Sequence, residues 1–281
     1  MSVVAAGGRV GIVRRNLHHI ASEIAVLPGV RLLAEPLYWR EFRQRRIGNT
    51  YYGVYKTRAE AEARVHQSAP SSFDIEASGR MYDHRLTMLE SFDYPALFWF
   101  SKFLDGGQRR IFDLGGHVGL SYYAFQQYLD YPGDMRWQVH DVPAVMQSGR
   151  ALAAERDEKG MLEFVDLAAA DGSDVLMAKG SLQYLDYTLS DLLLRLDKRP
   201  AHVLVNLTPM HSSRAFFTLQ HIVIAICPYR IGALPEFLAS VRSLGYHLID
   251  CWDHPERTVR VPFHPECYVD RYYGFYFRRD R

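Results

Sequence analysis

The stretch Arg110–Gly119, RIFDLGGHVG, decides the fold together with the LSYYA that follows it. It predicts a short apolar strand, a glycine turn and a helix, because Leu120, Tyr123 and Ala124 recur at helical spacing. Glycines in such a turn let the backbone approach a ligand closely, and the free N–H groups at the start of the helix face that ligand. The stretch therefore predicts a ligand site directly after a strand.

The spacing Asp-x-Gly-Gly-x-x-Gly narrows the class of ligand. A dinucleotide site requires Gly-x-Gly-x-x-Gly, and Asp113 stands where that pattern has its first glycine. A carboxylate at this point repels a pyrophosphate but accepts hydrogen bonds from an amine. The spacing thus favours a cofactor with an amino-acid end and argues against a dehydrogenase.

Length, composition and charge indicate only a broad class of protein. The 281 residues are 48% hydrophobic and 23% charged, which is typical of one large globular domain or a domain with an appendage. A net charge of +1 gives no reason to expect a nucleic-acid partner. The three cysteines form no CxxC pair, no apolar run of about 18 residues occurs and the N-terminus lacks the apolar core of a signal peptide. We therefore expect a cytoplasmic protein with no transmembrane span.

The first 50 residues are basic, with eight arginines, no lysine and three glutamates. Ile12, Leu17, Ile20 and Ile24 fit a helical stripe that ends at Pro28-Gly29. One interpretation is a basic amphipathic helix that makes peripheral contact with a membrane or an anionic partner. The other, which the short stripe favours, is a helix packed on the domain with a solvated basic face.

Six further strands are expected after the glycine turn, and a helix is expected between most of them. The stretch from Ser212 to Arg230 does not fit a bare doubly wound sheet and is interpreted as an insertion with strand-like segments. The expected strands are 135–141, 161–165, 174–179, 202–207, 246–252 and 272–277. The expected helices are 143–159, 189–196 and 235–244.

Two strand ends carry candidate ligand groups. Asp141 ends the second strand, where its carboxylate can accept hydrogen bonds from both hydroxyls of a ribose. The alternative is a helix cap, because Val142 and Pro143 follow directly. Gly180 and Ser181 follow the fourth strand, and ligands of open α/β sheets bind beyond such carboxyl ends.

The glycine turn resembles the first motif of class I S-adenosylmethionine (SAM)-dependent methyltransferases. Over residues 50–277, the chain also resembles a bacterial family of SAM-dependent methyltransferases that is often encoded near surface-polysaccharide genes. The residues that carry this second resemblance are Gly53-x-Tyr55, Phe112–Tyr122, Trp137-x-Val139, Asp141-x-Pro143, Ser181–Leu185, Thr208-Pro209 and Pro228–Arg230.

The resemblance implies an α/β fold with a doubly wound, mostly parallel seven-stranded sheet and a helical N-terminal extension. It implies a helical extension or lid over 1–104 and a SAM-binding domain over 105–281, with an insertion at about 211–231. The aromatic stretch 75–104 is either this lid or plain core packing. The implied cofactor is SAM, and the implied cofactor-binding residues are Asp113, Gly115, Gly116, Gly119, Asp141, Val142, Asp166, Gly180 and Ser181. Asp166, at the end of the third strand, is either an adenine contact or a solvated loop residue.

Methyl transfer from a sulfonium is an in-line displacement, so the enzyme aligns the acceptor and, for an oxygen acceptor, removes a proton. His211, just past the fifth strand, is the candidate base, and a surface loop histidine is the alternative. His117 is expected to orient backbone groups, and Lys179 is a further candidate for contact with the acceptor. No metal is expected, because the spacing of Asp253, His254, His264 and Cys267 matches no tight zinc pattern.

The sequence thus predicts a SAM-dependent methyltransferase, directed to oxygen, that acts on a saccharide or related small polar acceptor. The alternative is a catalytically inert methyltransferase-fold protein that serves as a binding or regulatory module, since no convincing acid–base pair is present. The oligomeric state is not predicted.

Overall fold

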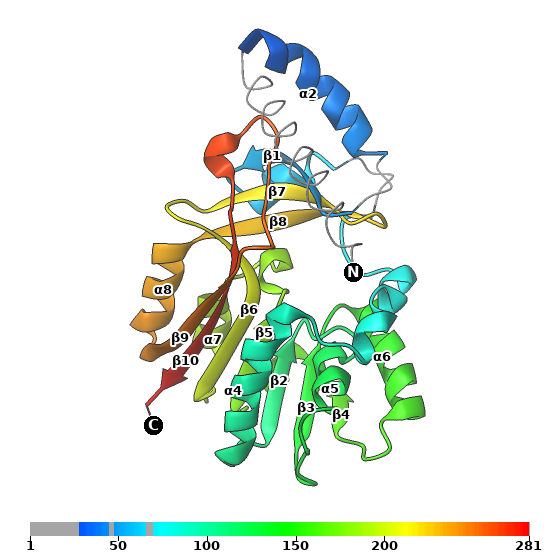
Figure 1. Cartoon of the computed structure of the whole chain (residues 1–281), viewed down its shortest axis with the longest axis vertical. Helices are drawn as coiled ribbons and strands as arrows, with labels where there is room; N and C mark the ends of the chain where they lie inside the picture. The colour runs from blue at the N-terminus through cyan, green and yellow to red at the C-terminus, as the bar shows by residue number, and fades with distance from the viewer. Residues whose placement is uncertain (1–27, 45–47, 66–69, 281) are drawn as a thin grey trace, which may run out of the picture.

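A computed structural model describes residues 28–44, 48–65 and 70–280 of the chain. The predicted amphipathic stripe from Ile12 to Ile24, and the membrane contact assigned to it, lie outside these residues and stay predictions. Figure 1 shows a large α/β body, a smaller layer of strands above it, and helix α2 (Pro28–Phe42) at the far end of that layer.

The body is built on seven strands in the order β4-β3-β2-β5-β6-β10-β9. Neighbours from β4 to β6 pair in parallel, whereas β10 pairs antiparallel with β6 on one side and β9 on the other. This confirms the predicted α/β fold with a doubly wound, mostly parallel seven-stranded sheet. The strands are β2 (Arg110–Leu114), β3 (Arg136–His140), β4 (Leu162–Phe164), β5 (Val175–Lys179), β6 (His202–His211), β9 (Tyr246–His254) and β10 (Tyr272–Arg279).

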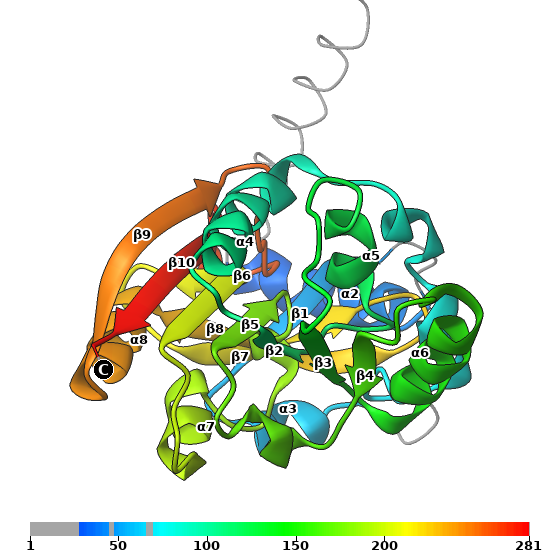
Figure 2. The ribbon, with the colours of Figure 1, turned by 90° about the horizontal axis from the view of Figure 1, so that it is seen from below.

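Side chains alternate along the central strands, so that each face of the sheet buries its own apolar cluster. Ile111 and Met177 point into the cluster formed with α4, α5 and α6, whereas Phe112 and Leu176 point into the cluster formed with α7 and α8. Figure 2 shows α4 and α5 on one side of the sheet and α7 on the other. The helices are α4 (Tyr94–Asp105), α5 (Leu120–Phe125), α6 (Pro143–Arg156), α7 (Leu189–Arg195) and α8 (Leu234–Ser243). Short 3₁₀ helices span Glu76–Arg80, Asp83–Leu86 and Ser91–Asp93 ahead of α4.

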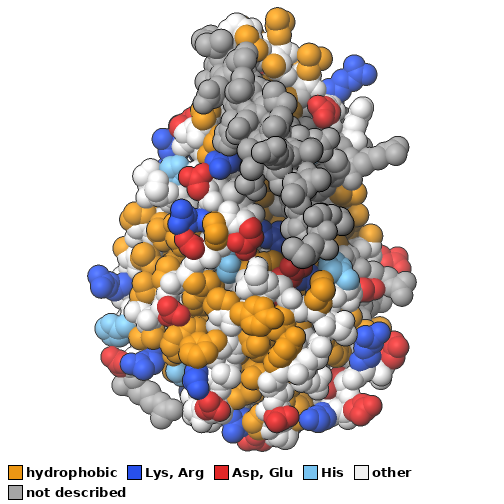
Figure 3. Space-filling model, viewed as in Figure 1, with side chains coloured by type: hydrophobic (Ala, Val, Ile, Leu, Met, Phe, Trp, Pro, Cys, Tyr) orange, Lys and Arg blue, Asp and Glu red, His pale blue; other side chains and the backbone are white. Residues whose placement is uncertain are grey.

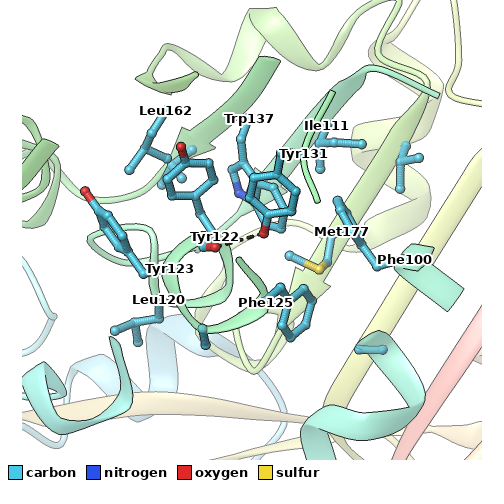
Figure 4. Packing of buried hydrophobic residues seen from close by; sticks show 14 of the residues in the cluster. Phe100, Ile111, Leu120, Tyr122, Tyr123, Phe125, Tyr131, Trp137, Leu162 and Met177 are labelled. Atoms are coloured by element: carbon cyan, nitrogen blue, oxygen red, sulfur yellow. Dashed lines mark hydrogen bonds between the residues drawn. The ribbon is translucent and has the colours of Figure 1, made fainter. Parts of the chain in front are cut away.

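Aromatic rings fix α5 against β3 beneath the glycine turn (Figure 4). Trp137 is fully buried, with its ring centroid 4.7 Å from that of Phe100 and 5.7 Å from that of Tyr122. The hydroxyl of Tyr131 donates a hydrogen bond to the carbonyl oxygen of Tyr122 at 2.8 Å. Because α5 has little more than one turn of its own, this packing holds it in place.

The smaller layer joins segments that lie far apart in the sequence. Strand β1 (Thr50–Tyr55) from the N-terminal extension pairs antiparallel with β7 (Phe216–His221), which pairs antiparallel with β8 (Ile226–Ala233). A short helix, α3 (Arg58–Glu62), follows β1. The N-terminal extension therefore contributes a strand besides its helices, and it shares one antiparallel sheet with the expected insertion. The predicted division into two domains stays a prediction.

Strand β6 connects the two layers. It runs four residues beyond its expected end, and Leu207 in its middle has a positive φ of 54°. The register of the β6–β10 pair also shifts between Tyr273 and Phe275. Such an irregularity bends a strand and raises its twist. The end of β6 thereby reaches β8, where Met210 and His211 pair in parallel with Gly232 and Ala233.

No helix in the described ranges is long and apolar enough to cross a membrane. On the face seen in Figure 3, hydrophobic side chains gather in the lower half, over α4. On α4, Tyr94 and Phe98 are each 53% exposed.

Candidate active site

A cavity of about 840 Å³ lies at the carboxyl ends of β2, β3 and β5 and extends to the smaller layer. Small-molecule sites range from about 300 to 1,000 Å³, so this cavity has room for a cofactor and an acceptor together. We call its two parts the glycine end and the tyrosine end. The glycine end comprises Asp113, Gly115, Gly116, Asp141 and Asp166, and the tyrosine end comprises Tyr51, Arg85, Tyr229, Arg257 and Tyr272.

Two positions in the turn after β2 accept only glycine. Gly115 has a positive φ of 72°, and a Cβ atom added there would overlap the Cβ atom of Ser181. A Cβ atom on Gly116 would lie 2.5 Å from Cγ of Asp113. Both glycines line the cavity. The turn thus gives a ligand close access to the backbone, as the sequence predicts.

Asp113 is the most deeply buried carboxyl group of the cavity wall, with 1% of its surface exposed. Its Oδ2 accepts a hydrogen bond from Nε1 of Trp137 at 3.1 Å, whereas its Oδ1 is buried and has no partner. Burial raises the pKa of this carboxyl to about 7. A cationic amine bound beside Oδ1 would satisfy the missing hydrogen bond and favour the ionised carboxylate. The site therefore fits the amino-acid end of a cofactor.

Asp141 holds the other side of the turn. Its Oδ2 accepts a hydrogen bond from the backbone N–H of His117 at 2.9 Å, and its Oδ1 accepts one from that of Val142 at 2.7 Å. Burial raises its pKa. The alternative role as a helix cap is not what the structure shows, because Val142 occupies the cap position of α6 and the N–H of Ala144 bonds to Asp74. Each oxygen of Asp141 keeps a second lone pair for a ligand hydroxyl.

His117 and Gly119 lie in the second half of the turn, and both have a positive φ. His117 has a positive φ of 57°, and its Nε2 lies 2.9 Å from the carbonyl oxygen of Ser78. It lines the cavity, and burial lowers the pKa of its imidazole. Gly119, with φ of 89°, begins α5 and packs against Leu162, but it does not line the cavity. Of the predicted cofactor-binding residues, Gly119 is the one that the structure places outside the wall.

The ends of the neighbouring strands complete the glycine end. Gly180, Ser181, Val142 and Asp166, which are predicted to bind the cofactor, all line the cavity. The hydroxyl of Ser181 donates a hydrogen bond to the carbonyl oxygen of Leu114, which ties the end of β5 to the end of β2. Asp166 lies exposed at the rim.

Lys179 lies between the two ends of the cavity and is engaged in an ion pair. Its Nζ lies 2.7 Å from Oδ1 of Asp93, whose side chain is 1% exposed. Burial lowers the pKa of Lys179, and the carboxylate of Asp93 opposes that shift. Lys179 lines the cavity, and its contact with an acceptor stays a prediction.

His211 does not line the cavity. Its Nδ1 accepts hydrogen bonds from the backbone N–H groups of Ser213 and Arg214 at 3.1 and 3.2 Å. Its Nε2 lies 3.1 Å from the carbonyl oxygen of Glu266, which requires the proton to be on Nε2. Because both ring nitrogens are bonded to backbone atoms, the geometry does not support the predicted role of His211 as a base. The ring holds the end of β6 to the loop before β10.

The tyrosine end is built from residues for which the sequence predicts no functional role. The hydroxyl of Tyr272 lies 3.1 Å from that of Tyr51 and 2.8 Å from that of Tyr229. Nε2 of Gln220 donates to the hydroxyl of Tyr51 at 3.3 Å, and the hydroxyl of Tyr184 donates to Oε1 of Gln220 at 2.6 Å. Burial raises the pKa values of Tyr51, Tyr229 and Tyr272. These phenols therefore stay protonated near neutral pH, and the one proton that their mutual hydrogen bonds leave can be donated to a polar ligand.

Among the described residues, no group of three or more histidine, cysteine or carboxylate side chains is placed to hold a metal ion. His254, one of the loop residues weighed as a ligand, instead directs its Nε2 at Oδ1 of Asn206 at 2.8 Å. The described cysteines Cys227, Cys251 and Cys267 are all free.

The strand order, the antiparallel β10 between β6 and β9 and the glycine turn after β2 define a Rossmann-like domain of the class I methyltransferase type. No protein-family model matches the sequence, and no curated protein matches it either.

Solved structures with a similar fold include several methyltransferases. Magnesium protoporphyrin IX methyltransferase from Synechocystis PCC 6803 with bound S-adenosylhomocysteine (SAH) is 11% identical, with a TM-score of 0.47 over 74% of this chain and 96% of its own. A SAM-dependent methyltransferase from Mesorhizobium loti is 15% identical, with a TM-score of 0.42 over 67% of this chain and 98% of its own. The 1,6-didemethyltoxoflavin-N1-methyltransferase from Burkholderia thailandensis is 17% identical, with a TM-score of 0.40 over 69% and 92% of the two chains. At these identities and scores the likeness carries no conclusion about the reaction, and the fold rests on the strand order.

Proposed function

We propose that this protein is a SAM-dependent methyltransferase that methylates an oxygen atom of a saccharide or related small polar acceptor. The observation that carries the proposal is the glycine end, where the unpartnered Oδ1 of Asp113 and the carboxylate of Asp141 flank a turn that accepts only glycine. When bound, SAM would supply an electrophilic methyl group on its sulfonium.

Each residue of the glycine end has a part in this proposal. Asp113 receives the amine of the amino-acid end, and Asp141 receives the ribose hydroxyls. Asp166, on the exposed rim, lies toward the adenine. Gly115 and Gly116 admit the cofactor to the backbone of the turn, whereas Gly119 acts indirectly by beginning α5.

The acceptor occupies the tyrosine end, whose phenols and arginines suit a polyhydroxylated molecule. A small polar acceptor, rather than a macromolecule, accords with a site enclosed between two layers. The link to surface polysaccharide and a cytoplasmic location are part of the same proposal. They are supported by the family resemblance and by the three free cysteines, which suit a reducing compartment.

One observation favours the alternative of a catalytically inert binding or regulatory protein. The histidines that line the cavity are His117 and His140, both at the glycine end, so no described histidine faces the acceptor. Binding of SAH without turnover on a broad panel of hydroxylated acceptors would support this alternative.

Isothermal titration of SAH tests the cofactor assignment directly. Wild type is expected to bind, and Asp141→Ala is expected to lose about tenfold to hundredfold in affinity, because two hydrogen bonds to a carboxylate are removed. Asp197→Ala is the matched control, since Asp197 is exposed and does not line the cavity. A folded wild type that binds neither SAM nor SAH would refute the proposal.

A further inference from the structure

The tyrosine end contains more positive charge than its carboxylates balance. Asp93 is buried and is shared by two cations, since its Oδ1 lies 2.7 Å from Nζ of Lys179 and its Oδ2 lies 3.2 Å from Nη2 of Arg85. Nε of Arg85 is buried and has no hydrogen-bond partner. One carboxylate thus serves two cations, and one donor of the guanidinium group is left unsatisfied.

A third cation is held at the same place. The guanidinium carbon of Arg257 lies 4.9 Å from the ring centroid of Phe92, and that of Arg85 lies 5.0 Å from the same centroid. Both arginines line the cavity. In the described part of the chain, Arg257 has no carboxylate partner within salt-bridge distance. Two guanidinium groups that contact one ring repel each other, and an anion bound to both from the cavity would offset that repulsion.

The other charged groups near this end do not cancel the surplus. Glu256 lines the cavity, but its side chain is 48% exposed and its Oε1 lies 3.7 Å from Nδ1 of His254. Arg58 also lines the cavity, and its Nε already pairs with Glu62 at 2.6 Å. The carboxylates of Asp113 and Asp141 belong to the glycine end, on the far side of Lys179. Apart from Glu256, the carboxylates of the cavity wall therefore lie at the glycine end, and the guanidinium groups lie at the other end.

We propose that the acceptor is an anion whose carboxylate or phosphate group binds to Arg85 and Arg257. This inference rests on the proposed methyltransferase function and narrows its acceptor to an acidic molecule. Guanidinium groups suit the assignment, because their fixed N–H donors match the oxygens of carboxylates and phosphates in pairs. The hydrogen bonds among Tyr51, Tyr229 and Tyr272 use two of their three phenolic protons, so this cluster can donate one hydrogen bond and accept others from hydroxyl groups of the same molecule. An acidic sugar or a sugar phosphate supplies such hydroxyl groups.

Titration calorimetry with three probes tests the charge requirement on wild-type protein, with and without saturating SAH. The probes are D-glucuronate, D-glucose 6-phosphate and neutral D-glucose. At least one anion is expected to bind about tenfold or more tightly than glucose, with an affinity that falls as salt is raised, because screening weakens charge–charge attraction. The tighter of the two anions identifies the group as a carboxylate or a phosphate. Equal binding of all three probes, or no binding of either anion, would overturn the inference.

Arg257→Gln locates the anion, and Arg242→Gln is its matched control. Both arginines are exposed, so neither change threatens the core, and Arg242 lies on α8 away from the cavity. Arg257→Gln is expected to weaken anion binding about tenfold and to leave SAH binding unchanged, whereas Arg242→Gln changes neither. Unchanged anion binding in Arg257→Gln would contradict the assignment. If SAH does not bind but the anion still binds through Arg257, the anion site stands and the methyltransferase proposal fails.

Discussion

The two ends of the cavity are built in opposite ways. The glycine end comes from turns that follow neighbouring parallel strands, and its buried carboxylates are held by backbone N–H groups and by the indole N–H of Trp137. The tyrosine end is assembled from β1, β8, β10, the 3₁₀ helix Asp83–Leu86 and the loop after β9, and its side chains are phenols and guanidinium groups. The first end depends on local backbone geometry, and the second depends on how distant segments meet.

The difference also separates the electrostatics of the two ends. At the glycine end, burial raises the pKa values of Asp113 and Asp141, so a cationic ligand would favour their ionised forms. At the tyrosine end, Lys179 and Arg85 share the carboxylate of Asp93, and Arg257 lies beside them. We therefore expect changes at the glycine end to act on cofactor binding and changes at the tyrosine end to act on acceptor binding. Three substitutions test this separation.

The largest effect is expected for Gly115→Ala. The new Cβ atom would overlap Ser181 at a residue whose φ is 72°, so both backbone strain and overlap oppose folding. We expect a loss of about 3 kcal/mol in the free energy of unfolding and no measurable binding of SAH. Urea denaturation and calorimetry measure the two quantities.

Gly133→Ala is the control for this change, because an added Cβ atom there meets nothing within 4 Å. It is expected to alter the free energy of unfolding by less than about 1 kcal/mol. Equal effects of the two substitutions would show that the turn after β2 has no special conformational requirement.

Asp113→Asn is expected to act on stability and on binding with opposite signs. Burial raises the pKa of Asp113 to about 7 in the folded protein, against 3.8 for an ordinary aspartate carboxyl. Between these values the folded protein keeps a proton that the unfolded chain releases, so wild-type stability falls as pH rises through this window. Asparagine does not titrate. As pH is raised from 5 to 8, the unfolding free energy of the variant should therefore rise by about 2–3 kcal/mol relative to that of wild type.

The same variant is expected to bind SAH more weakly, because an amide attracts a cationic amine less than a carboxylate does. Denaturation at several pH values and calorimetry at pH 8 measure the two effects. A stability difference that does not change with pH would mean that Asp113 is already ionised at pH 5 in the folded protein.

The same contrast explains which parts were predictable from the sequence. The glycine spacing from Asp113 to Gly119 and the apolar runs of the strands are local signals, and the structure confirms the sheet that they predict. Asp141 and Ser181 were found because the carboxyl ends of parallel strands meet at one edge. Tyr51, Arg85 and Arg257 share no spacing in the sequence, so no local pattern brings them together. Tyr51 reaches the cavity because β1 pairs with β7, where Tyr51 lies opposite Gln220. Arg85 and Arg257 come from separate segments that meet over the ring of Phe92.

The predicted role of His211 rests on the assumption of a regular sheet. Its position just past the fifth expected strand placed it on the binding edge of a regular sheet. The strand, however, bends at Leu207 and continues to His211, which carries the ring past the cavity to backbone partners in two loops. A positive φ at a leucine is rare, and nothing in the sequence signals it.

The smallest effect is expected for Tyr272→Phe, which removes the central hydroxyl of the tyrosine end. The hydroxyls of Tyr51 and Tyr229 each lose a partner, at 3.1 and 2.8 Å, so we expect a loss of about 1–2 kcal/mol in the free energy of unfolding. Binding of SAH should stay unchanged, and the KM of an acidic acceptor should rise severalfold. Tyr273→Phe is the control, because Tyr273 neighbours Tyr272 but does not line the cavity. If Tyr272→Phe weakened SAH and left the acceptor unaffected, the phenols would belong to the cofactor, and the division of the cavity into two ends with separate ligands would not hold.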